Sequence, residues 1–151
     1  MKKILAAVDF SNATDGVVAT ASGMARAYGA ELHLLHVIEP EPTYTAYGFT
    51  PEEFPAIQTF QSEIRNRAKK TLENTAAKAA GSGVDPIIHL GDGSPLHVLL
   101  EKAEELGVDL VVLGSHGHGI VASLLLGSVA EGMIRKAKYP TLVIPAGEKL
   151  N

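Results

Sequence analysis

Four small residues in the last third of the chain have the types and the spacing that suit the binding of a phosphate group. Gly114 and Gly117 follow an apolar run, and Gly127-Ser128 stands where a helix is expected to begin. Glycine lacks a Cβ atom, so its backbone can adopt positive φ and can approach a ligand closely. The first N–H groups of a helix, together with the helix dipole, favour an anion. A strand, a glycine-rich loop and a helix start in this order therefore predict a phosphate-binding loop.

The charge pattern of this loop limits its chemistry. No lysine or arginine occurs between residues 114 and 131. The phosphate charge must then be met by backbone N–H groups, by a divalent metal, or by the side chains of Ser115, His116 and Ser128. A loop without a fixed cation or a base to activate water suits the holding of a nucleotide better than its cleavage. His116 and His118 lack nearby carboxylates, so we expect them to form hydrogen bonds or face solvent rather than bind a metal.

The elements that must position this loop follow a βαβ pattern. Apolar strands are predicted over residues 2–8, 30–38, 84–90, 108–113 and 139–145. Helices with amphipathic spacing are predicted over residues 17–28, 54–80, 95–106 and 128–137. This alternation predicts one α/β domain over residues 1–151, with a doubly wound, five-stranded parallel sheet and helices on both faces.

Local signals refine this prediction. Pro86 interrupts the third strand early and places it at a sheet edge, because proline cannot donate to a ladder. The fourth strand, residues 108–113, is almost purely apolar and is expected at the sheet centre. The glycines of residues 91–93 predict a turn, and Ser11 or Asn12 is expected to cap the first helix.

Two strand ends carry polar or glycine residues that point to a ligand crevice. In open parallel sheets, ligands bind beyond the carboxyl ends of the strands, where the strand order reverses. The first strand ends at Asp9 and the fourth at Gly114. If these strands are neighbours, Asp9 faces the glycine loop. The alternatives are that Asp9 is only a turn residue before a helix and that the glycines are ordinary turn residues.

Composition bounds the partners and the surroundings of the protein. The 151 residues are 46% hydrophobic and 20% charged, which is typical of a globular chain. The formal charge of −4 argues against nucleic-acid binding, and no apolar run is long enough to span a membrane. There is no cysteine, and the first residues do not resemble a signal peptide. We therefore expect a cytoplasmic protein.

The spacing Gly114-x2-Gly117-x9-Gly127-Ser128 matches, at every fixed position, the nucleotide-binding signature G-2x-G-9x-G-(S/T) of the universal stress protein family. The chain also resembles this family in its opening Lys-Ile-Leu-Ala-Ala-Val-Asp-Phe-Ser and its closing Pro-Thr-Leu-Val-Ile-Pro. The resemblance implies an α/β fold with strand order 3-2-1-4-5 and ATP bound between the first and fourth strands. It also implies a homodimer through the last strand, from Tyr139 to Pro145. Such pairing would satisfy an open sheet edge.

By position, the resemblance also implies which residues contact the nucleotide. Asp9, at the end of the first strand, corresponds to an acidic residue that faces it. The positions implied to line the adenine and ribose are Ala7, Val37, Leu113 and Gly114. The positions implied to hold the phosphates are His116, Gly117, Gly127, Ser128 and Val129.

These observations predict an ATP-binding, dimeric stress-response regulator that acts as a switch or sensor, with Mg²⁺ or Mn²⁺ as a possible companion of the nucleotide. One alternative is a slow ATP hydrolase in which Asp9 holds the metal. Another is a nucleotide-free interaction module that engages an unknown protein partner through the long loop predicted over residues 39–55.

Overall fold

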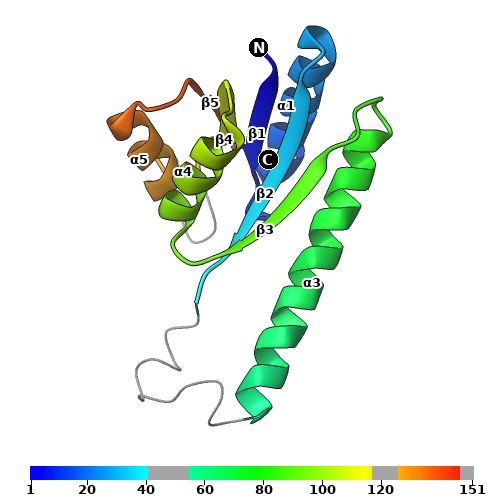
Figure 1. Cartoon of the computed structure of the whole chain (residues 1–151), viewed down its shortest axis with the longest axis vertical. Helices are drawn as coiled ribbons and strands as arrows, with labels where there is room; N and C mark the ends of the chain where they lie inside the picture. Colours follow the sequence, from blue (N-terminus) through cyan, green and yellow to red (C-terminus); the bar gives the residue numbers. More distant parts are fainter. Residues whose placement is uncertain (41–54, 117–125, 147–151) are drawn as a thin grey trace, which may run out of the picture.

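A five-stranded parallel sheet forms the centre of the protein. The computed structural model describes residues 1–40, 55–116 and 126–146. The strand order is β3-β2-β1-β4-β5, as expected (Figure 1). The strands are β1 (Lys3–Ala7), β2 (Glu31–Ile38), β3 (Ile87–Asp92), β4 (Leu110–Gly114) and β5 (Thr141–Ile144).

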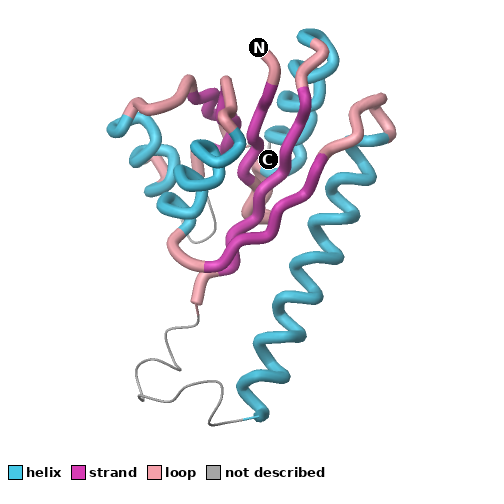
Figure 2. The backbone as a smooth tube through the Cα atoms, in the orientation of Figure 1, coloured by secondary structure: helices cyan, strands magenta, loops and turns pink. Residues whose placement is uncertain are grey.

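The described helices cover both faces of the sheet (Figures 1 and 2), which confirms the predicted fold class. One face carries α1 (Thr14–Tyr28) and α3 (Pro55–Ala80), and the other carries α4 (Pro95–Leu106) and α5 (Ser128–Lys136). Successive strand residues point to opposite faces. In β1, Ile4 and Ala6 are buried under α1 and α3, whereas Leu5 is buried on the side of α4 and α5. This explains why the strands are continuous apolar runs. Among the described residues, no helix combines the length and apolarity needed to cross a membrane.

The edge strand β3 differs in its bounds from the prediction. It is at the edge, as Pro86 indicates, but it begins at Ile87, directly after the proline, and continues to Asp92. Gly91 therefore belongs to the strand and not to a turn. A Cβ atom at Gly91 would lie 2.6 Å from Cγ1 of Val98 in α4, so the bare backbone lets the helix pack there. Of Gly91 and Gly93, only Gly93 has a positive φ, +129°, as expected for a turn glycine.

The remaining strands and helix ends differ in smaller ways. The fourth strand is interior, between β1 and β5, while β1 is the central strand. Neither Ser11 nor Asn12 is the N-cap of α1, which is Ala13 without a side-chain hydrogen bond. Ser11 instead stabilises the turn before the helix, because its Oγ accepts a hydrogen bond from the N–H of Ala13 at 3.3 Å. The long loop expected over residues 39–55 lies mostly outside the described residues.

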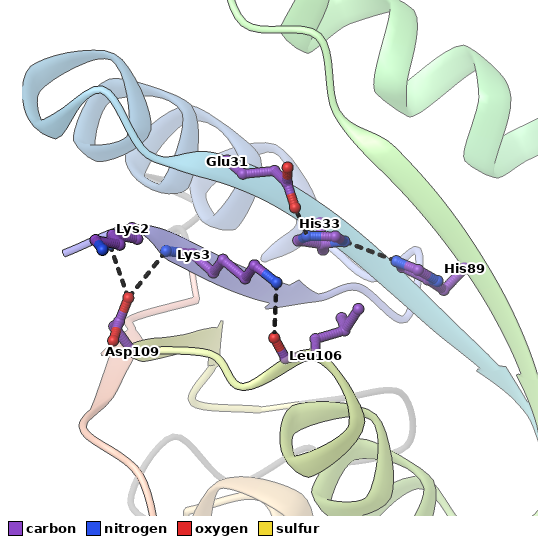
Figure 3. A network of polar contacts seen from close by, with 7 residues as sticks. All are labelled: Lys2, Lys3, Glu31, His33, His89, Leu106 and Asp109. Atoms are coloured by element: carbon purple, nitrogen blue, oxygen red, sulfur yellow. Dashed lines mark hydrogen bonds and ion pairs between the residues drawn. The ribbon is translucent and has the colours of Figure 1, made fainter.

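The amino ends of β1 and β4 are held together by Asp109. Its Oδ2 accepts hydrogen bonds from the backbone N–H groups of Lys2 and Lys3, at 2.7 and 3.0 Å (Figure 3). The same two hydrogen bonds lower the pKa of the Asp109 carboxyl, because they stabilise its charged form. The Nζ of Lys3 also donates to the carbonyl of Leu106 at 3.0 Å. These contacts fix β1 beside β4 at the end of the sheet opposite the candidate site.

Candidate functional site

The carboxyl ends of β1 and β4 meet where the strand order reverses. The two strands pair in parallel, with Ile4 opposite Leu110 and Ala6 opposite Val112. From this junction the chain connections run outward in opposite directions, which is the geometry that leaves a crevice for a ligand. A cavity of about 460 Å³ opens there, within the size range of small-molecule sites.

The predicted site residues that the structure describes come together in this cavity. Gly117 lies outside the described residues. The other nine line the cavity: Ala7, Asp9, Val37, Leu113, Gly114, His116, Gly127, Ser128 and Val129. They come from the ends of three strands and from the start of α5, so segments more than 100 residues apart in the sequence share one site.

The end of β1 reaches the cavity through a tight turn. Oδ1 of Asp9 accepts a hydrogen bond from the N–H of Ser11 at 2.9 Å, so Asp9 does act as a turn residue while it lines the cavity. Phe10 adopts φ +62°, in the left-handed region that a non-glycine residue rarely occupies. Its ring stacks on His36 with centroids 4.0 Å apart. The ring of His36 is fixed in turn, because its Nδ1 donates to the carbonyl of Val8 at 2.8 Å.

Positive φ does not explain why the signature has glycine at the two positions that the structure describes, 114 and 127. Neither Gly114 nor Gly127 has it, and Gly127 has an extended conformation with φ −63° and ψ 153°. The reason for glycine at position 114 is packing within the protein. A Cβ atom there would lie 2.8 Å from the Cβ of Ala13, just before α1. The expectation that conformational freedom explains this glycine is therefore wrong.

The start of α5 is the part of the site best suited to an anion. Gly127 is its N-cap and provides no side-chain hydrogen bond, so as far as the described residues go the first N–H groups of the helix keep their donor capacity. The acidic residue in this first turn is Glu131, whose Oε1 accepts two hydrogen bonds from Arg135, at 2.7 and 3.0 Å. This ion pair offsets part of the carboxylate charge near the helix start.

Ser115 and His116 differ in what they offer a ligand. The hydroxyl of Ser115 already contacts Nδ1 of His116 at 2.8 Å and accepts from the N–H of Ala146 at 3.2 Å. It is therefore engaged within the protein rather than aimed at a phosphate. His116 lines the cavity, and its Nε2 is buried and has no hydrogen-bond partner among the described residues.

Several residues that line the cavity were not predicted from the sequence. They include Thr14 and Val17 of α1, His36 of β2, Ile64 and Ala68 of α3, and Pro95 and Leu99 of α4. Ile64 and Ala68 belong to the apolar face of the predicted 54–80 helix, which is the signal in the sequence that points to them. Thr14 contributes a hydroxyl that is buried without a hydrogen-bond partner in the described part of the chain.

A second polar cluster lies away from this cavity, where β2 and β3 face α4. His33 Nδ1 lies 2.8 Å from Nε2 of His89, and His33 Nε2 lies 2.6 Å from Oε1 of Glu31 (Figure 3). Burial, and then the nearby charge of Lys102, lowers the pKa of His89. Within the ranges that the structure describes, no group of three or more acidic or histidine side chains is arranged to hold a metal ion.

The sheet order and the cavity at its switch point place the protein in the doubly wound α/β class. Comparison with known sequences then identifies the family. The profile of the "Universal stress protein family" matches residues 1–145, and the chain belongs to this family.

Relatives match over nearly their whole length. The chain is 32% identical over 146 residues to universal stress protein YxiE of Bacillus subtilis, covering 94% of this chain and 97% of the relative. Among solved structures, that of MJ0577 of Methanocaldococcus jannaschii matches with a TM-score of 0.82 and 30% identity, over 98% of each chain.

Two further structural neighbours were solved with a nucleotide. One is a universal stress protein in complex with cAMP, with a TM-score of 0.67 and 24% identity over 97% of this chain and 98% of that one. The other is the universal stress protein of Archaeoglobus fulgidus in complex with dAMP, with a TM-score of 0.64 and 23% identity over 95% and 97%. Their likeness to this chain is one of fold.

Proposed function

We propose that the protein binds an adenine nucleotide, ATP in the first place, in the cavity between β1 and β4, and that it acts as a dimeric stress-response regulator. The observation that carries this proposal is the convergence on one cavity of nine residues that the family resemblance implies at the nucleotide. They come from segments that lie far apart in the sequence.

The chemistry of the cavity supports a nucleotide. Ala7, Val37 and Leu113 provide apolar walls of the kind that pack against a purine base. The start of α5 and the buried Nε2 of His116 provide donor positions for phosphate oxygens. The cavity therefore offers both kinds of group that a nucleotide contacts.

The neighbours bound to cAMP and dAMP support the choice of an adenine nucleotide over other anions. The resemblance of the loop to the G-2x-G-9x-G-(S/T) signature of the family favours ATP among the adenine nucleotides. A divalent metal, if one takes part, would be carried by the phosphates of the nucleotide, with Asp9, which lines the cavity as Glu39 also does, as its carboxylate partner.

Equilibrium titration with ATP, ADP, AMP and adenosine, each with and without Mg²⁺, tests the proposal. We expect ATP to bind more tightly than adenosine, because only ATP reaches the helix start. No affinity for any of these compounds would refute the proposal. Mass spectrometry of small molecules that copurify with the protein provides an independent identification.

Two further measurements address the site and the alternatives. Gly117→Val is expected to abolish ATP binding and leave the fold intact, and unchanged affinity would refute the role of the loop. Single-turnover mixing with labelled ATP separates a nucleotide-holding protein from a hydrolase. Hydrolysis that takes longer than minutes supports a protein that holds the nucleotide. Faster hydrolysis supports the metal-dependent hydrolase.

A further inference from the structure

The backbone of Ser115 joins the end of β4 to two other segments at the base of the site. Its N–H donates to the carbonyl of Ile144 at 2.8 Å, and its own carbonyl accepts from the N–H of Gly127 at 2.6 Å. The residue is only 9% exposed. Ser115 therefore fixes β4, the end of β5 and the start of α5 relative to one another.

The side chain of Ser115 is held as firmly as its backbone. The N–H of Ala146, just beyond β5, donates to Oγ at 3.2 Å. While Oγ accepts this bond it keeps its own proton, which it can donate to Nδ1 of His116, 2.8 Å away. A neutral imidazole that accepts at Nδ1 carries its proton on Nε2.

The other ring nitrogen of His116, Nε2, lacks a hydrogen-bond partner in the part of the chain that the structure describes. Nε2 is buried and has no partner among the described residues, although the ring lines the cavity. A buried polar group without a partner is costly, and an anionic oxygen in the cavity would satisfy an Nε2–H donor.

A second histidine in the same cavity is fixed in the opposite way. Nδ1 of His36 donates to the carbonyl of Val8, so its Nε2 is left as an acceptor. The Nδ1 partners of the two rings differ: a hydroxyl, which can donate to His116, and a carbonyl, which can only accept from His36.

We propose that Ser115 is a positioning residue: its hydroxyl, held by the N–H of Ala146, orients His116 and keeps the proton on Nε2, so that this atom donates to an anionic group of the ligand. The proposal rests on the proposed function for the identity of that group, a phosphate. It also links the end of β5 to the ligand site through a single side chain.

Long-range ¹H–¹⁵N NMR of the ligand-free, ¹⁵N-labelled protein tests the tautomer directly. In the wild type we expect His116 to show the Nε2–H form and His36 the Nδ1–H form. In Ser115→Ala, His116 should lose this preference, whereas Ser115→Thr, which keeps the hydroxyl, should retain it. An Nδ1–H form of His116 in the wild type, or an identical tautomer in Ser115→Ala, would overturn the proposal. If Ser115→Ala does not fold, Ser115→Cys takes its place, because cysteine has a similar volume and only a weak hydrogen-bonding group. The tautomer of His116 in the wild-type spectrum tests the proposal without any variant.

Binding provides the second readout. Ser115→Ala should lower the affinity for ATP about tenfold, which corresponds to the loss of one hydrogen bond to a charged group. The affinity for adenosine should not change. Equal losses for both ligands would contradict a phosphate-directed role. If the wild type binds no ATP while His116 shows the Nε2–H form only when Ser115 has its hydroxyl, the proposed function fails and the positioning role stands.

Discussion

The Cβ position of Gly114 lies 2.8 Å from the Cβ atom of Ala13, closer than two such carbons approach in proteins. This relationship joins the last residue of β4 to the residue that caps α1. Glycine at position 114 lets the helix start close against the strand that forms one wall of the ligand cavity.

We therefore expect Gly114→Ala to lower the free energy of unfolding by about 1–3 kcal/mol, the usual effect of overpacking a buried contact. Urea denaturation measures it. The double variant Ala13→Gly/Gly114→Ala removes the close contact and should recover part of the loss. Additive effects of the two substitutions would show that this contact is not the cause.

The same position shows what the sequence could reveal and what it could not. Local patterns were enough to predict the alternation of strands and helices and to place a loop and a helix start after the fourth strand. The strand order came from the family resemblance, because an alternating pattern alone is compatible with several orders. The packing reason for Gly114 depends on Ala13, about a hundred residues earlier, and no local pattern contains it.

Two other features of the site were hidden for related reasons. The sequence presents the hydroxyl of Ser115 as a phosphate ligand, but its neighbour His116 and the N–H of Ala146, which only the fold brings close, already occupy it. Ile64 of α3 lines the cavity because that long helix passes the end of the sheet, which its apolar spacing alone does not indicate. Tertiary proximity, rather than residue type, decides both roles.

Substitution of Ser128 should have opposite effects on stability and on binding. Ser128 is the first residue of α5 and is exposed. In Ser128→Asp, the carboxylate lies beside the positive end of the helix dipole, so we expect about 0.3–1 kcal/mol of stabilisation at low salt. The same charge should repel phosphates, so affinity for ATP should fall while that for adenosine does not. Ser128→Asn is the neutral control of equal size. Unchanged ATP affinity in Ser128→Asp would contradict the assignment of phosphates to this helix start.

His89 is expected to make stability depend on pH. Its pKa in the folded protein is lowered from about 6.5 by burial, by Lys102 and by His33, while Glu105 acts in the opposite direction. Between the lowered value and 6.5 the unfolded chain binds more protons, so the free energy of unfolding decreases as pH falls through 6.5. Below the folded pKa this group causes no further change.

Urea denaturation at a series of pH values tests this expectation. His89→Gln should make the pH dependence below 6.5 less steep, because the titrating group is gone. Lys102→Met should also make the pH dependence less steep, but by less, because it removes only one of the groups that lower the pKa of His89. A slope in His89→Gln equal to that of the wild type would assign the pH dependence to other groups.

The outer edge of β5, with which no other described strand pairs, provides a test of the proposed dimer. The carbonyls of Pro140 and Ile144 accept from β4, and in a parallel ladder alternate residues direct both backbone groups to the same neighbour. The backbone of Leu142 therefore faces β4, whereas Thr141 and Val143 present their N–H and C=O groups at the outer edge of the sheet.

Val143→Pro removes one of these outward N–H groups and no bond to β4, and proline is tolerated at such edge positions. If two copies pair through this edge, the variant should sediment as a monomer at concentrations where the wild type is a dimer. Val143→Ala keeps the N–H group and should remain dimeric, which separates loss of the backbone donor from loss of the side chain. A dimeric Val143→Pro would contradict pairing through β5. Because Ala146 and Ser115 connect the end of β5 to His116, ATP affinity measured on the monomeric variant also shows whether the edge and the ligand site are coupled.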